Sequence, residues 1–499
     1  MSQPLLCVSL TAATTAELRR RRDAETPADL VELRLDTVAD PDVSGALSGR
    51  TRPVIVTCRP MWEGGAFRGS EEERQRILAD ALEAGAEYVD IESNAGFGDL
   101  VRRGGRRVVL SMHDFEGMPS DLSARVRAMR AECPGVVKVA VTAQKLSDCL
   151  PLLELAREVR AVGGNGDPAF TWIAMGMAGI PSRILAVRFG SCWTYAGDGV
   201  APGQVPPVQL VNEFGFRRIT AQTQVYGVVG FPLSHSVSPA MHNTAFQAAN
   251  LDAVYLPLEA ADVDDFERAA SAFDIRGASV TIPHKVAFFK HLVARGGPDV
   301  LDRLSRAAGA VNTVRCHEGH WQGRNTDVAG FLAPLMGRRQ LAGMRAAILG
   351  AGGAARAVAV ALKSAGARTT LHARNIDGAR EMGRLVDVEA QPFPPARGSW
   401  DLLVNATPVG MYPAVDDTPW PHAEFDGDVV YDLIYNPPKT RFLREASAAG
   451  CLTIGGLEML VAQAQEQADW WTGIRPPAQL LRDAAVRALG RTEVAGVKS

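Results

Sequence analysis

The stretch Arg345-Ala-Ala-Ile-Leu-Gly-Ala-Gly-Gly-Ala-Ala355 joins an apolar run directly to a glycine turn. Residues 345–350 predict a buried strand, the Ala-rich segment to Ala365 predicts a helix, and residues 369–374 predict a second strand. A strand, a glycine turn, a helix and a strand in this order are typical of a dinucleotide-binding unit, because the glycines let the backbone approach a pyrophosphate at the helix N-terminus. A tight turn without a ligand is the alternative.

The end of the second predicted strand favours NADP as the dinucleotide. NAD enzymes usually carry an acidic residue at this point, which binds the ribose 2′-hydroxyl. This chain has His372-Ala-Arg-Asn375 instead, and the arginine, Arg374, suits a 2′-phosphate. Asp377 follows three residues later and leaves NAD open as a second possibility.

Composition indicates a soluble globular protein of several domains. The chain has 499 residues, of which 46% are hydrophobic and 22% charged, which predicts two to four domains at roughly 150 residues each. Lys and Arg number 53 and Asp and Glu 56, a formal net charge of −3. This balance argues against a nucleic-acid binder and against a membrane-surface protein, both of which are usually basic. The expected partners are small molecules. The sequence does not fix the oligomeric state, and a monomer is compatible with it.

Cysteine usage and the N-terminus predict a cytoplasmic protein. The 7 cysteines are an odd number without a CxxC pair, which favours a reducing compartment. Residues 1–10 lack the basic and apolar regions of a signal peptide. The most apolar long window, residues 344–365, contains Arg345, Arg356 and Lys363, so no membrane-spanning helix is expected.

The first 200 residues alternate short β-branched runs with amphipathic helical stretches. The expected helices include residues 71–84, 120–130 and 146–162. Eight strand–helix units of this kind fit a (β/α)8 TIM barrel, and a doubly wound open sheet fits the same alternation. The expected strands are residues 5–10, 30–36, 53–59, 88–92, 107–115, 136–142, 170–176 and 192–197.

Lys138 lies inside an apolar run, Val136-Val-Lys-Val-Ala-Val141, where an ammonium group is costly to bury. A desolvated amine can attack a carbonyl to form an imine. A core lysine neutralised by a carboxylate, or an edge strand, is the alternative. Polar side chains at the ends of other predicted strands favour an active site, since the strand ends of a barrel converge on one face. These side chains are Glu32, Arg34, Asp36, Arg59, His113 and Asp114.

Several motifs of the first half occur in the order of a known family. They are Val31-Glu-Leu-Arg-Leu-Asp36, Thr57-Cys-Arg59, Glu63-Gly-Gly65, Ser111-Met-His-Asp-Phe115, Val137-Lys-Val139, Pro181-Ser-Arg183 and Ala201-Pro-Gly-Gln204. Residues 1–218 thereby resemble type I 3-dehydroquinate dehydratase. The resemblance implies that Lys138 forms a Schiff base with the substrate ketone and that His113 is the general acid and base. Val200 replaces the family's usual serine, and we expect reduced efficiency at most. The implied substrate-binding residues are Glu32, Arg34, Arg59, Arg183 and Gln204.

A set of hydroxyl, amide and charged side chains opens the second half. The segment Gly230-Phe-Pro-Leu-Ser-His-Ser-Val-Ser-Pro239 presents Ser236 and Ser238, and Val280-Thr-Ile-Pro-His-Lys285 ends in a lysine. Val311-Asn-Thr313 and Asn325-Thr-Asp327 add an amide and a carboxylate. Such groups suit a polyhydroxylated anion, with a Lys/Asp pair for proton transfer. Helix caps and turns are the alternative for each, above all for Ser238 before Pro239.

With Asn405-Ala-Thr-Pro-Val-Gly-Met411, Tyr431-Asp-Leu-Ile-Tyr-Asn-Pro437 and Gly456-Leu-Glu-Met-Leu-Val-Ala-Gln463, these segments resemble shikimate dehydrogenase over residues 225–489. The resemblance implies a catalytic pair, Lys285 and Asp327. It also implies carboxylate binding by Ser236 and Ser238, and hydroxyl binding by Thr281, Asn312, Asp327 and Gln463. Ala373 and Asn375 stand where the family often has Asn and Thr, so fewer polar contacts with the cofactor are expected. The implied NADP-binding residues are Gly350, Ala351, Gly352, Gly353, Ala354, Arg374, Asn405 and Thr407.

The whole chain thus resembles the bifunctional 3-dehydroquinate dehydratase/shikimate dehydrogenase family. The predicted parts are a dehydratase TIM barrel at 1–218, a linker at 219–224, a substrate-binding α/β lobe at 225–330, a Rossmann NADP lobe at 331–455 and C-terminal helices at 456–490. One alternative is a quinate/shikimate dehydrogenase, and another is an inactive or weakened dehydratase half that serves for docking or regulation. No metal is expected, because His317-Glu-Gly-His320 fits an exposed hairpin tip.

Overall fold

The computed structural model describes residues 3–496 except residues 165, 198, 200, 201, 234, 235 and 423, and it describes only the backbone of 491–496. Contacts divide the chain into two compact units. The first comprises Met1–Val225, Pro232–Ser234 and Asp252–Asp274, and the second comprises Tyr226–Phe231, His235–Leu251 and Ile275–Ser499. None of the described helices is long and apolar enough to cross a membrane.

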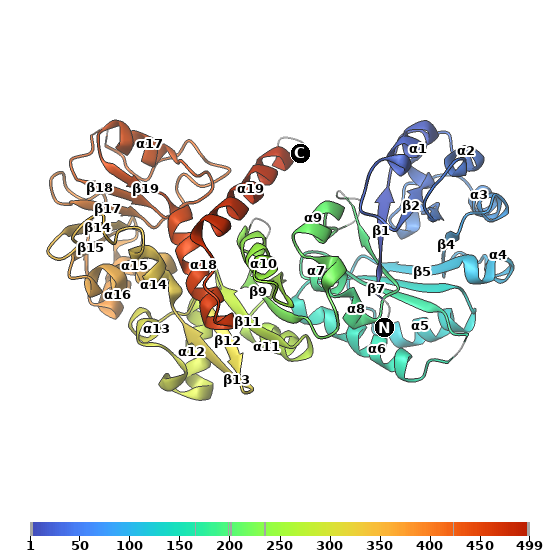
Figure 1. Ribbon diagram of the computed structural model, residues 1–499, viewed down its shortest axis with the longest axis horizontal. Coiled ribbons are helices and arrows are strands. Elements are labelled where there is room, and N and C mark those ends of the chain that lie inside the picture. The colour runs from blue at the N-terminus through green and yellow to red at the C-terminus, as the bar shows by residue number, and fades with distance from the viewer. Residues whose placement is uncertain are drawn as a thin grey trace. The chain divides into compact units, whose positions relative to one another are not determined.

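The first unit is built on an 8-stranded parallel sheet that is nearly closed into a barrel (Figure 1). Its strand order is β7-β6-β5-β4-β3-β2-β1-β8. The nitrogen of Cys192 donates to the carbonyl of Phe170 at 2.7 Å across the seam between β7 and β8. All eight expected strands are confirmed, with ends that differ by two residues at most. They are β1 (Leu5–Leu10), β2 (Leu30–Arg34), β3 (Val54–Thr57), β4 (Tyr88–Glu92), β5 (Val108–Asp114), β6 (Val136–Thr142), β7 (Ala169–Met175) and β8 (Trp193–Ala196).

Helices lie on the outside of these strands (Figure 1). α3 shows how the sequence sets their bounds, because Ser70 and Glu73 form a reciprocal capping box at its start. The third expected helix divides into a 3-10 turn, η4 (Leu146–Cys149), and α6. The helices are α1 (Thr15–Asp23), α2 (Val43–Leu47), α3 (Glu71–Glu83), α4 (Gly98–Gly104), α5 (Leu122–Ala131), α6 (Leu150–Ala161), α7 (Ile180–Ile184), α8 (Ala186–Phe189) and α9 (Pro207–Asn212).

Two later elements, β10 (Ala253–Glu259) and α11 (Val263–Ala272), also fall into the first unit. Buried Asp265 of α11 accepts hydrogen bonds from the nitrogens of Leu146 and Ser147 in η4, at 3.1 and 2.9 Å. At the other end of α11, Arg157 of α6 donates to the carbonyl of Ala272 at 3.3 Å. The segment 252–274 is therefore fixed against the α6 side of the barrel at both ends of its helix.

The second unit begins with a small sheet in which β9, β11, β12 and β13 follow one another. β12 pairs antiparallel with both β11 and β13. Two C-terminal helices return to this part, since α18 contacts α14 and α19 contacts α10. The elements are β9 (Gln224–Gly230), α10 (Ser238–Ala248), β11 (Ile275–Val280), α12 (Lys285–Gly296), α13 (Arg303–Ala308), β12 (Thr313–His317), β13 (His320–Arg324), α14 (Thr326–Leu332), α18 (Gly456–Thr472) and α19 (Ala478–Gly496).

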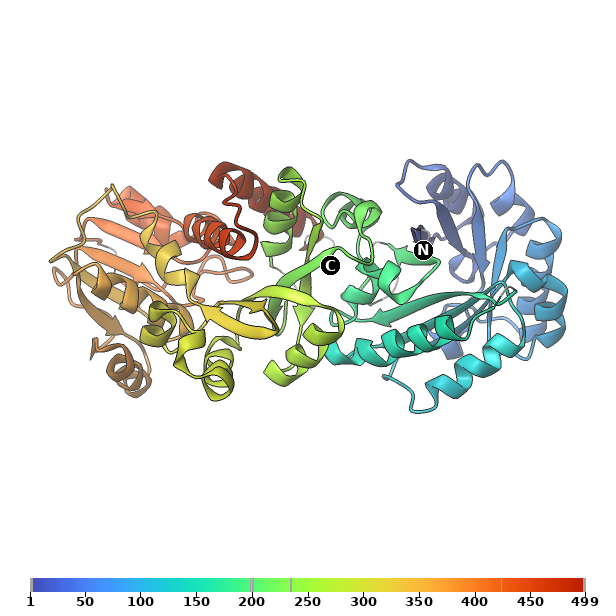
Figure 2. The ribbon, with the colours of Figure 1, turned by 60° about the horizontal axis from the view of Figure 1, so that its bottom comes forward.

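The rest of the second unit is a 6-stranded parallel sheet in the order β16-β15-β14-β17-β18-β19, seen side by side in Figure 2. This is the doubly wound order of a Rossmann fold. The sequence predicts the Ala-rich helix α15, which packs against β14, and its residues 357–362 are all buried. The elements are β14 (Arg345–Leu349), α15 (Gly353–Ser364), β15 (Arg368–His372), α16 (Ile376–Val386), β16 (Glu389–Gln391), β17 (Leu402–Asn405), β18 (Val429–Asp432), α17 (Arg441–Ala448) and β19 (Leu452–Ile454).

Candidate active sites

The inward faces of the barrel strands change from apolar to polar toward their C-terminal ends. In β6, Val136 belongs to the apolar core, and Lys138 points to the same side because side chains alternate along a strand. β5 changes in the same way, from Val109 to Ser111 and His113. Since the parallel strands of a barrel end at one face, these polar side chains meet there.

Lys138 is only 4% exposed, and its ammonium group lies between two carboxylates. Its Nζ is 3.0 Å from Oδ2 of Asp90 and 3.4 Å from Oε1 of Glu32. The ring of Tyr195 lies 4.3 Å from Nζ. The sequence left open whether this lysine is a neutralised core residue or a nucleophile. The carboxylates that would neutralise a core lysine are present, and Lys138 also lines a cavity, as expected of a nucleophile.

Arg59 connects this group of charges to a third acidic residue, Glu92. Its Nη2 donates to Oδ1 of Asp90 at 2.9 Å, and its Nη1 donates to Oε1 of Glu92 at 2.6 Å and to Oγ of Ser111 at 2.9 Å. Burial by itself would raise the pKa of Asp90, but the cations Arg59 and Lys138 outweigh burial and hold that pKa below its usual range. Asp90 therefore stays ionised and balances both cations.

His113 is held by Glu63, which lies in the 3-10 turn η2 (Met61–Glu63) after β3. Oε1 of Glu63 lies 2.8 Å from Nδ1 of His113 and accepts the backbone N–H of His113 at 2.9 Å. Burial, with the cations Arg59 and Lys138, lowers the pKa of His113 well below its ordinary value. His113 is thus a neutral imidazole at neutral pH, and its Nε2 is left to serve as a base.

The seven residues predicted for the first site come together. Arg183 is buried and donates to the carbonyls of Tyr195 and Pro202, at 3.5 and 3.1 Å. Burial lowers the pKa of Arg183 to about 10. Val200 lies outside the described residues, so its effect stays a prediction. One cavity of about 170 Å³ is lined by Glu32, Arg34, Arg59, His113, Lys138, Arg183 and Gln204.

Asp90 is not among the residues predicted for the first site, although the sequence of its strand contains a pattern that could have indicated it. The segment Tyr88-Val-Asp-Ile-Glu92 places two acids two residues apart in an apolar strand, so both face inward. Both are buried. Glu63 is part of a quoted motif, but its contact with His113 depends on how the chain turns after β3, and no spacing in the sequence reveals it.

The second unit brings Lys285 and Asp327 into contact, as predicted. Lys285 begins α12 and Asp327 lies in the first turn of α14, and Nζ of the lysine is 2.6 Å from Oδ2 of the aspartate. Nδ2 of Asn312 donates to the other carboxylate oxygen at 2.8 Å and to Oε1 of Gln463 at 3.1 Å. Oδ1 of Asn312 accepts the nitrogen of Thr326 at 2.7 Å, which fixes the orientation of the amide.

The predicted hydroxyl residues lie at the ends of neighbouring elements. Thr281 follows β11, and its nitrogen donates to the carbonyl of Val229 in β9 at 2.9 Å. The nitrogen of Ser238, at the start of α10, donates to Oγ of Ser236 at 3.3 Å. Within the described part of the chain, no hydrogen bond joins these three side chains to the pair of Lys285 and Asp327. Their roles in substrate binding stay predictions.

The glycine turn between β14 and α15 has a backbone that only glycine tolerates easily. Gly350 has φ +114°, and a Cβ there would lie 3.0 Å from the carbonyl oxygen of Ala406. A Cβ on Gly352 would meet no atom within 4 Å, so the space above it is open to a ligand. A Cβ on Gly353 would lie 3.9 Å from Cδ of Lys285, so the turn lies near the pair of Lys285 and Asp327.

A cavity of about 590 Å³ lies above this turn and is lined by Gly350, Ala351, Gly352, Arg374 and Thr407, among others. Three predicted cofactor residues are not in its wall. Gly353 and Ala354 begin α15, and Asn405 is buried beneath, where its Oδ1 accepts the nitrogen and hydroxyl of Thr407 at 3.0 and 2.7 Å. Asp377, the residue that kept NAD open, forms an ion pair with Arg380 at 3.2 Å.

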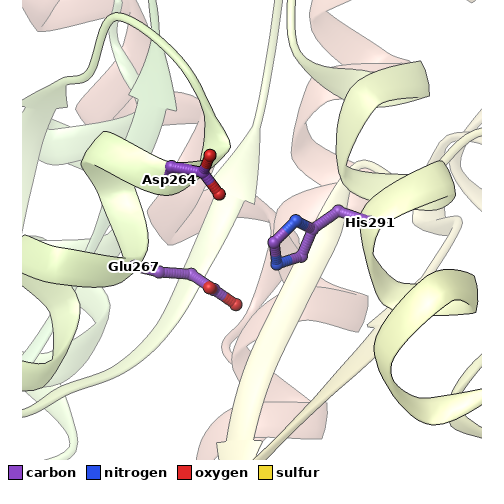
Figure 3. Close-up of side chains that lie close together, drawn as sticks. All are labelled: Asp264, Glu267 and His291. Atoms are coloured by element: carbon purple, nitrogen blue, oxygen red, sulfur yellow. The ribbon is translucent and has the colours of Figure 1, made fainter.

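The described residues include a group of three potential metal ligands. Figure 3 shows Asp264 and Glu267 of α11 and His291 of α12. α11 belongs to the first unit and α12 to the second, and no site is inferred from these three residues. His317 and His320 pair across the end of the β12–β13 hairpin, as the sequence predicts. The absence of a metal stays a prediction.

Three family models match the chain in succession. Residues 6–220 match type I 3-dehydroquinase, residues 228–314 the substrate-binding domain of shikimate dehydrogenase, and residues 456–486 the C-terminal domain of shikimate 5′-dehydrogenase.

Among known proteins, the bifunctional chloroplastic 3-dehydroquinate dehydratase/shikimate dehydrogenase of Arabidopsis thaliana is 34% identical over 91% of this chain and 79% of its own. The NADP(+) shikimate dehydrogenase of Carboxydothermus hydrogenoformans is 39% identical over 54% of this chain and 98% of its own. A crystal structure of shikimate 5-dehydrogenase from Thermus thermophilus, in complex with NADP(H) and shikimate, matches 53% of this chain and 99% of its own with 37% identity and a TM-score of 0.49.

The resemblance seen in the motifs therefore extends over almost the whole chain and through both units. The chain belongs to the family of bifunctional 3-dehydroquinate dehydratase/shikimate dehydrogenases.

Proposed function

We propose that the chain catalyses two successive steps, the dehydration of 3-dehydroquinate to 3-dehydroshikimate and the NADPH-dependent reduction of that ketone to shikimate. The observation that carries the first step is the cavity shared by Lys138 and His113. The observation that carries the second is the contact of Lys285 with Asp327 beside a glycine turn. The product of the first step is the substrate of the second.

In the dehydratase, Nζ of Lys138 attacks the carbonyl carbon of the substrate once the ammonium has lost its proton. Loss of water from that adduct leaves an imine between Nζ and the carbon. His113, held neutral, takes a proton from the carbon next to the imine and returns it to the departing hydroxyl, which leaves as a second water. Hydrolysis of the imine then releases the product and restores Lys138.

The cations of the same cavity suit the substrate carboxylate. Arg34 and Arg183 lie in its wall, and a guanidinium can hold a carboxylate through two parallel hydrogen bonds. Glu32 accepts hydrogen bonds from Oγ of Ser9 at 2.6 Å and from Oγ1 of Thr57 at 2.9 Å. These bonds fix the carboxylate of Glu32 toward the ring hydroxyls that a substrate would present.

In the reductase, Lys285 would hold the proton that the carbonyl oxygen gains, and Asp327 would orient the ammonium. NADPH supplies the hydride when it is bound. The open space over Gly352 and the guanidinium of Arg374 in the cavity wall support a pyrophosphate and a 2′-phosphate there. Asp377, the acidic residue that left NAD open as the cofactor, is paired with Arg380, and this contact gives no support to NAD.

The decisive experiment supplies the purified chain with 3-dehydroquinate and NADPH, and in parallel with 3-dehydroshikimate and NADPH. We expect NADPH oxidation in both. Oxidation only with 3-dehydroshikimate would mean that the dehydratase is inactive, and oxidation only with NADH would contradict the role given to Arg374. Comparing rates on shikimate and quinate in the reverse direction separates a shikimate from a quinate dehydrogenase.

Borohydride trapping tests the imine directly. Reduction of the imine in the presence of 3-dehydroquinate should add the mass of the reduced adduct to the peptide that contains Lys138. Lys138→Met should not be labelled and should still reduce 3-dehydroshikimate. If Lys138→Met dehydrates at the wild-type rate, the Schiff-base mechanism is wrong. Location in the cytoplasm and the oligomeric state stay predictions.

A further inference from the structure

Arg74 is a fully buried arginine in the first turn of α3, and the dehydratase mechanism above does not use it. Its side chain is 0% exposed, and it does not line the substrate cavity. A cation in the first turn of a helix opposes the helix dipole, and a buried guanidinium is costly without partners. Three glutamates, Glu71, Glu72 and Glu73, already suit this helix end. Nothing in the local structure of α3 therefore requires an arginine here.

Two hydrogen-bond partners of Arg74, Glu92 and the carbonyl of Cys58, lie on the barrel side of the helix, and a third, Glu71, lies in α3 itself. One of its terminal nitrogens, Nη1, donates to Oε2 of Glu92 in β4, and the same nitrogen donates to the carbonyl of Cys58 at 3.4 Å. Nε and Nη2 donate to Oε2 of Glu71 at 3.0 and 2.6 Å. The guanidinium also lies 4.6 Å from the centroid of the Phe97 ring. Each of the three guanidinium nitrogens thus has an acceptor.

Glu92 connects Arg74 to the catalytic lysine through a row of alternating charges. Glu92 binds Arg74 with one carboxylate oxygen and Arg59 with the other. Arg59 binds Asp90, and Asp90 binds Lys138. Glu92 and Asp90 are both buried, so the loss of a charged partner there is costly. The charge at one end of the row affects the groups at the other end.

Arg74 also contacts the segment that carries the partner of His113. The carbonyl of Cys58, which Arg74 holds, directly precedes Arg59. The ring of Trp62 lies 5.8 Å from the guanidinium, and Trp62 is the neighbour of Glu63 in η2. Arg74 therefore supports both the ion row and the turn that presents Glu63.

We propose that Arg74 is a positioning residue of the dehydratase, which fixes Glu92 and thereby the charge row that ends at Lys138. The inference rests on the proposed dehydratase activity. Removal of the guanidinium leaves one oxygen of Glu92 buried without a cation. Glu92 then takes up a proton or draws Arg59 away from Asp90, and either change alters the charge around Lys138.

The test compares the pH dependence of kcat/KM for dehydration in full-length Arg74→Leu, Arg74→Gln and Arg74→Lys proteins. The neutral variants should be about 10- to 100-fold slower, as expected for a displaced catalytic group, and their pH profiles should be displaced from that of the wild type. Arg74→Lys keeps a cation and should keep the wild-type profile at a reduced rate. Reduction of 3-dehydroshikimate by the same proteins should be unchanged.

Arg22→Leu is the matched control. Arg22 is another buried arginine of the barrel, 2% exposed, and it binds Asp23 and the carbonyls of Ala46 and Ser48. Its loss should lower the melting temperature without displacing the pH profile.

Three outcomes are informative. If Arg74→Leu does not fold, Arg74→Gln, which retains a polar donor, gives the same comparison. Wild-type pH profiles in the neutral variants would overturn the inference, even if their rates or melting temperatures fall. A wild-type protein that does not dehydrate 3-dehydroquinate would contradict the proposed function instead.

Discussion

The carboxyl group of Glu63 determines which nitrogen of His113 can act as a base. An ionised Glu63 accepts the proton of Nδ1 at 2.8 Å and leaves the lone pair on Nε2. A protonated Glu63 donates to Nδ1 instead, and the ring proton then lies on Nε2, which can no longer accept one. Burial raises the pKa of Glu63 to about 7. We therefore expect dehydration to slow as the pH falls through about 7.

Glu63→Gln separates this effect from other titrations. The glutamine oxygen accepts the Nδ1 proton at every pH, so the variant should lose the inflection near pH 7. Its rate at higher pH should fall by about 10-fold or more, since the negative charge beside the imidazolium is gone. The measurement is kcat/KM against pH for both proteins. An inflection that survives in Glu63→Gln belongs to another group.

Asp432, at the end of β18, is a buried carboxyl that costs stability at neutral pH. It accepts hydrogen bonds from Oγ1 of Thr440 at 2.6 Å, and from the nitrogen of Ile434 and Nδ2 of Asn405 at 3.0 Å each. Burial nevertheless raises its pKa from 3.8 to about 6. The folded group binds its proton more tightly than the unfolded one, so its stabilising effect is complete below pH 3.8 and is lost as the pH rises through about 6.

Asp432→Asn should therefore gain stability relative to the wild type between pH 4 and 7. A change of about two pKa units corresponds to about 3 kcal/mol, which is the upper limit of the relative gain. Thermal unfolding of both proteins across this range measures it. Asp401→Asn is the control of opposite sign, because a hydrogen bond from Arg345 lowers the pKa of Asp401. A constant difference between Asp432→Asn and the wild type would contradict the raised pKa.

In the turn between β14 and α15, two glycines are needed for different reasons, one for its backbone conformation and one for the space that a ligand would occupy. Gly350 has φ +114° and a close neighbour in Ala406, whereas a Cβ on Gly352 would meet nothing within 4 Å. Gly350→Ala should destabilise the second unit by about 1 kcal/mol or more, with or without cofactor. Gly352→Ala should leave the stability of the free protein unchanged and raise the KM for NADPH, because its methyl group enters the space for the pyrophosphate.

Melting curves without cofactor and initial rates of 3-dehydroshikimate reduction distinguish the two glycine variants. The dehydratase rate of both should equal that of the wild type. A Gly352→Ala protein with an unchanged KM for NADPH would show that the pyrophosphate does not lie against this turn.

Each of the two units contains the groups that we propose for its own reaction. Lys138 and its partners all belong to the first unit, and Lys285 and Asp327 to the second. Lys138→Met should therefore abolish dehydration and leave ketone reduction unchanged. Lys285→Met should slow ketone reduction and leave dehydration unchanged. A mixture of the two variants should convert 3-dehydroquinate to shikimate through free 3-dehydroshikimate, as measured by NADPH oxidation. Failure of the mixture, with each single activity intact, would mean that the intermediate does not leave the chain.

Both folds could be predicted from the amino-acid sequence alone. Short β-branched apolar runs separated by helical stretches predicted the eight barrel strands, because a parallel strand covered by helices is buried on both faces. The run that ends in Gly350 predicted the Rossmann strand and helix, because the turn needs glycines at fixed positions. Lys138 stands out as a charged group in an apolar strand, where a neutralised core lysine is equally compatible. The roles of Lys138 and His113 are implied by the family resemblance.

The pairing of the charged and titratable groups in the barrel depends on the tertiary structure. Asp90 as the counter-ion of Lys138, Glu63 as the partner of His113 and Arg74 as the support of Glu92 are contacts between residues far apart in the chain. Composition and periodicity record what a side chain is and which face of its element it occupies. They do not record the distance to another element, which depends on barrel closure and on the path of each loop. The ion row and the state of the imidazole are therefore properties of the folded molecule.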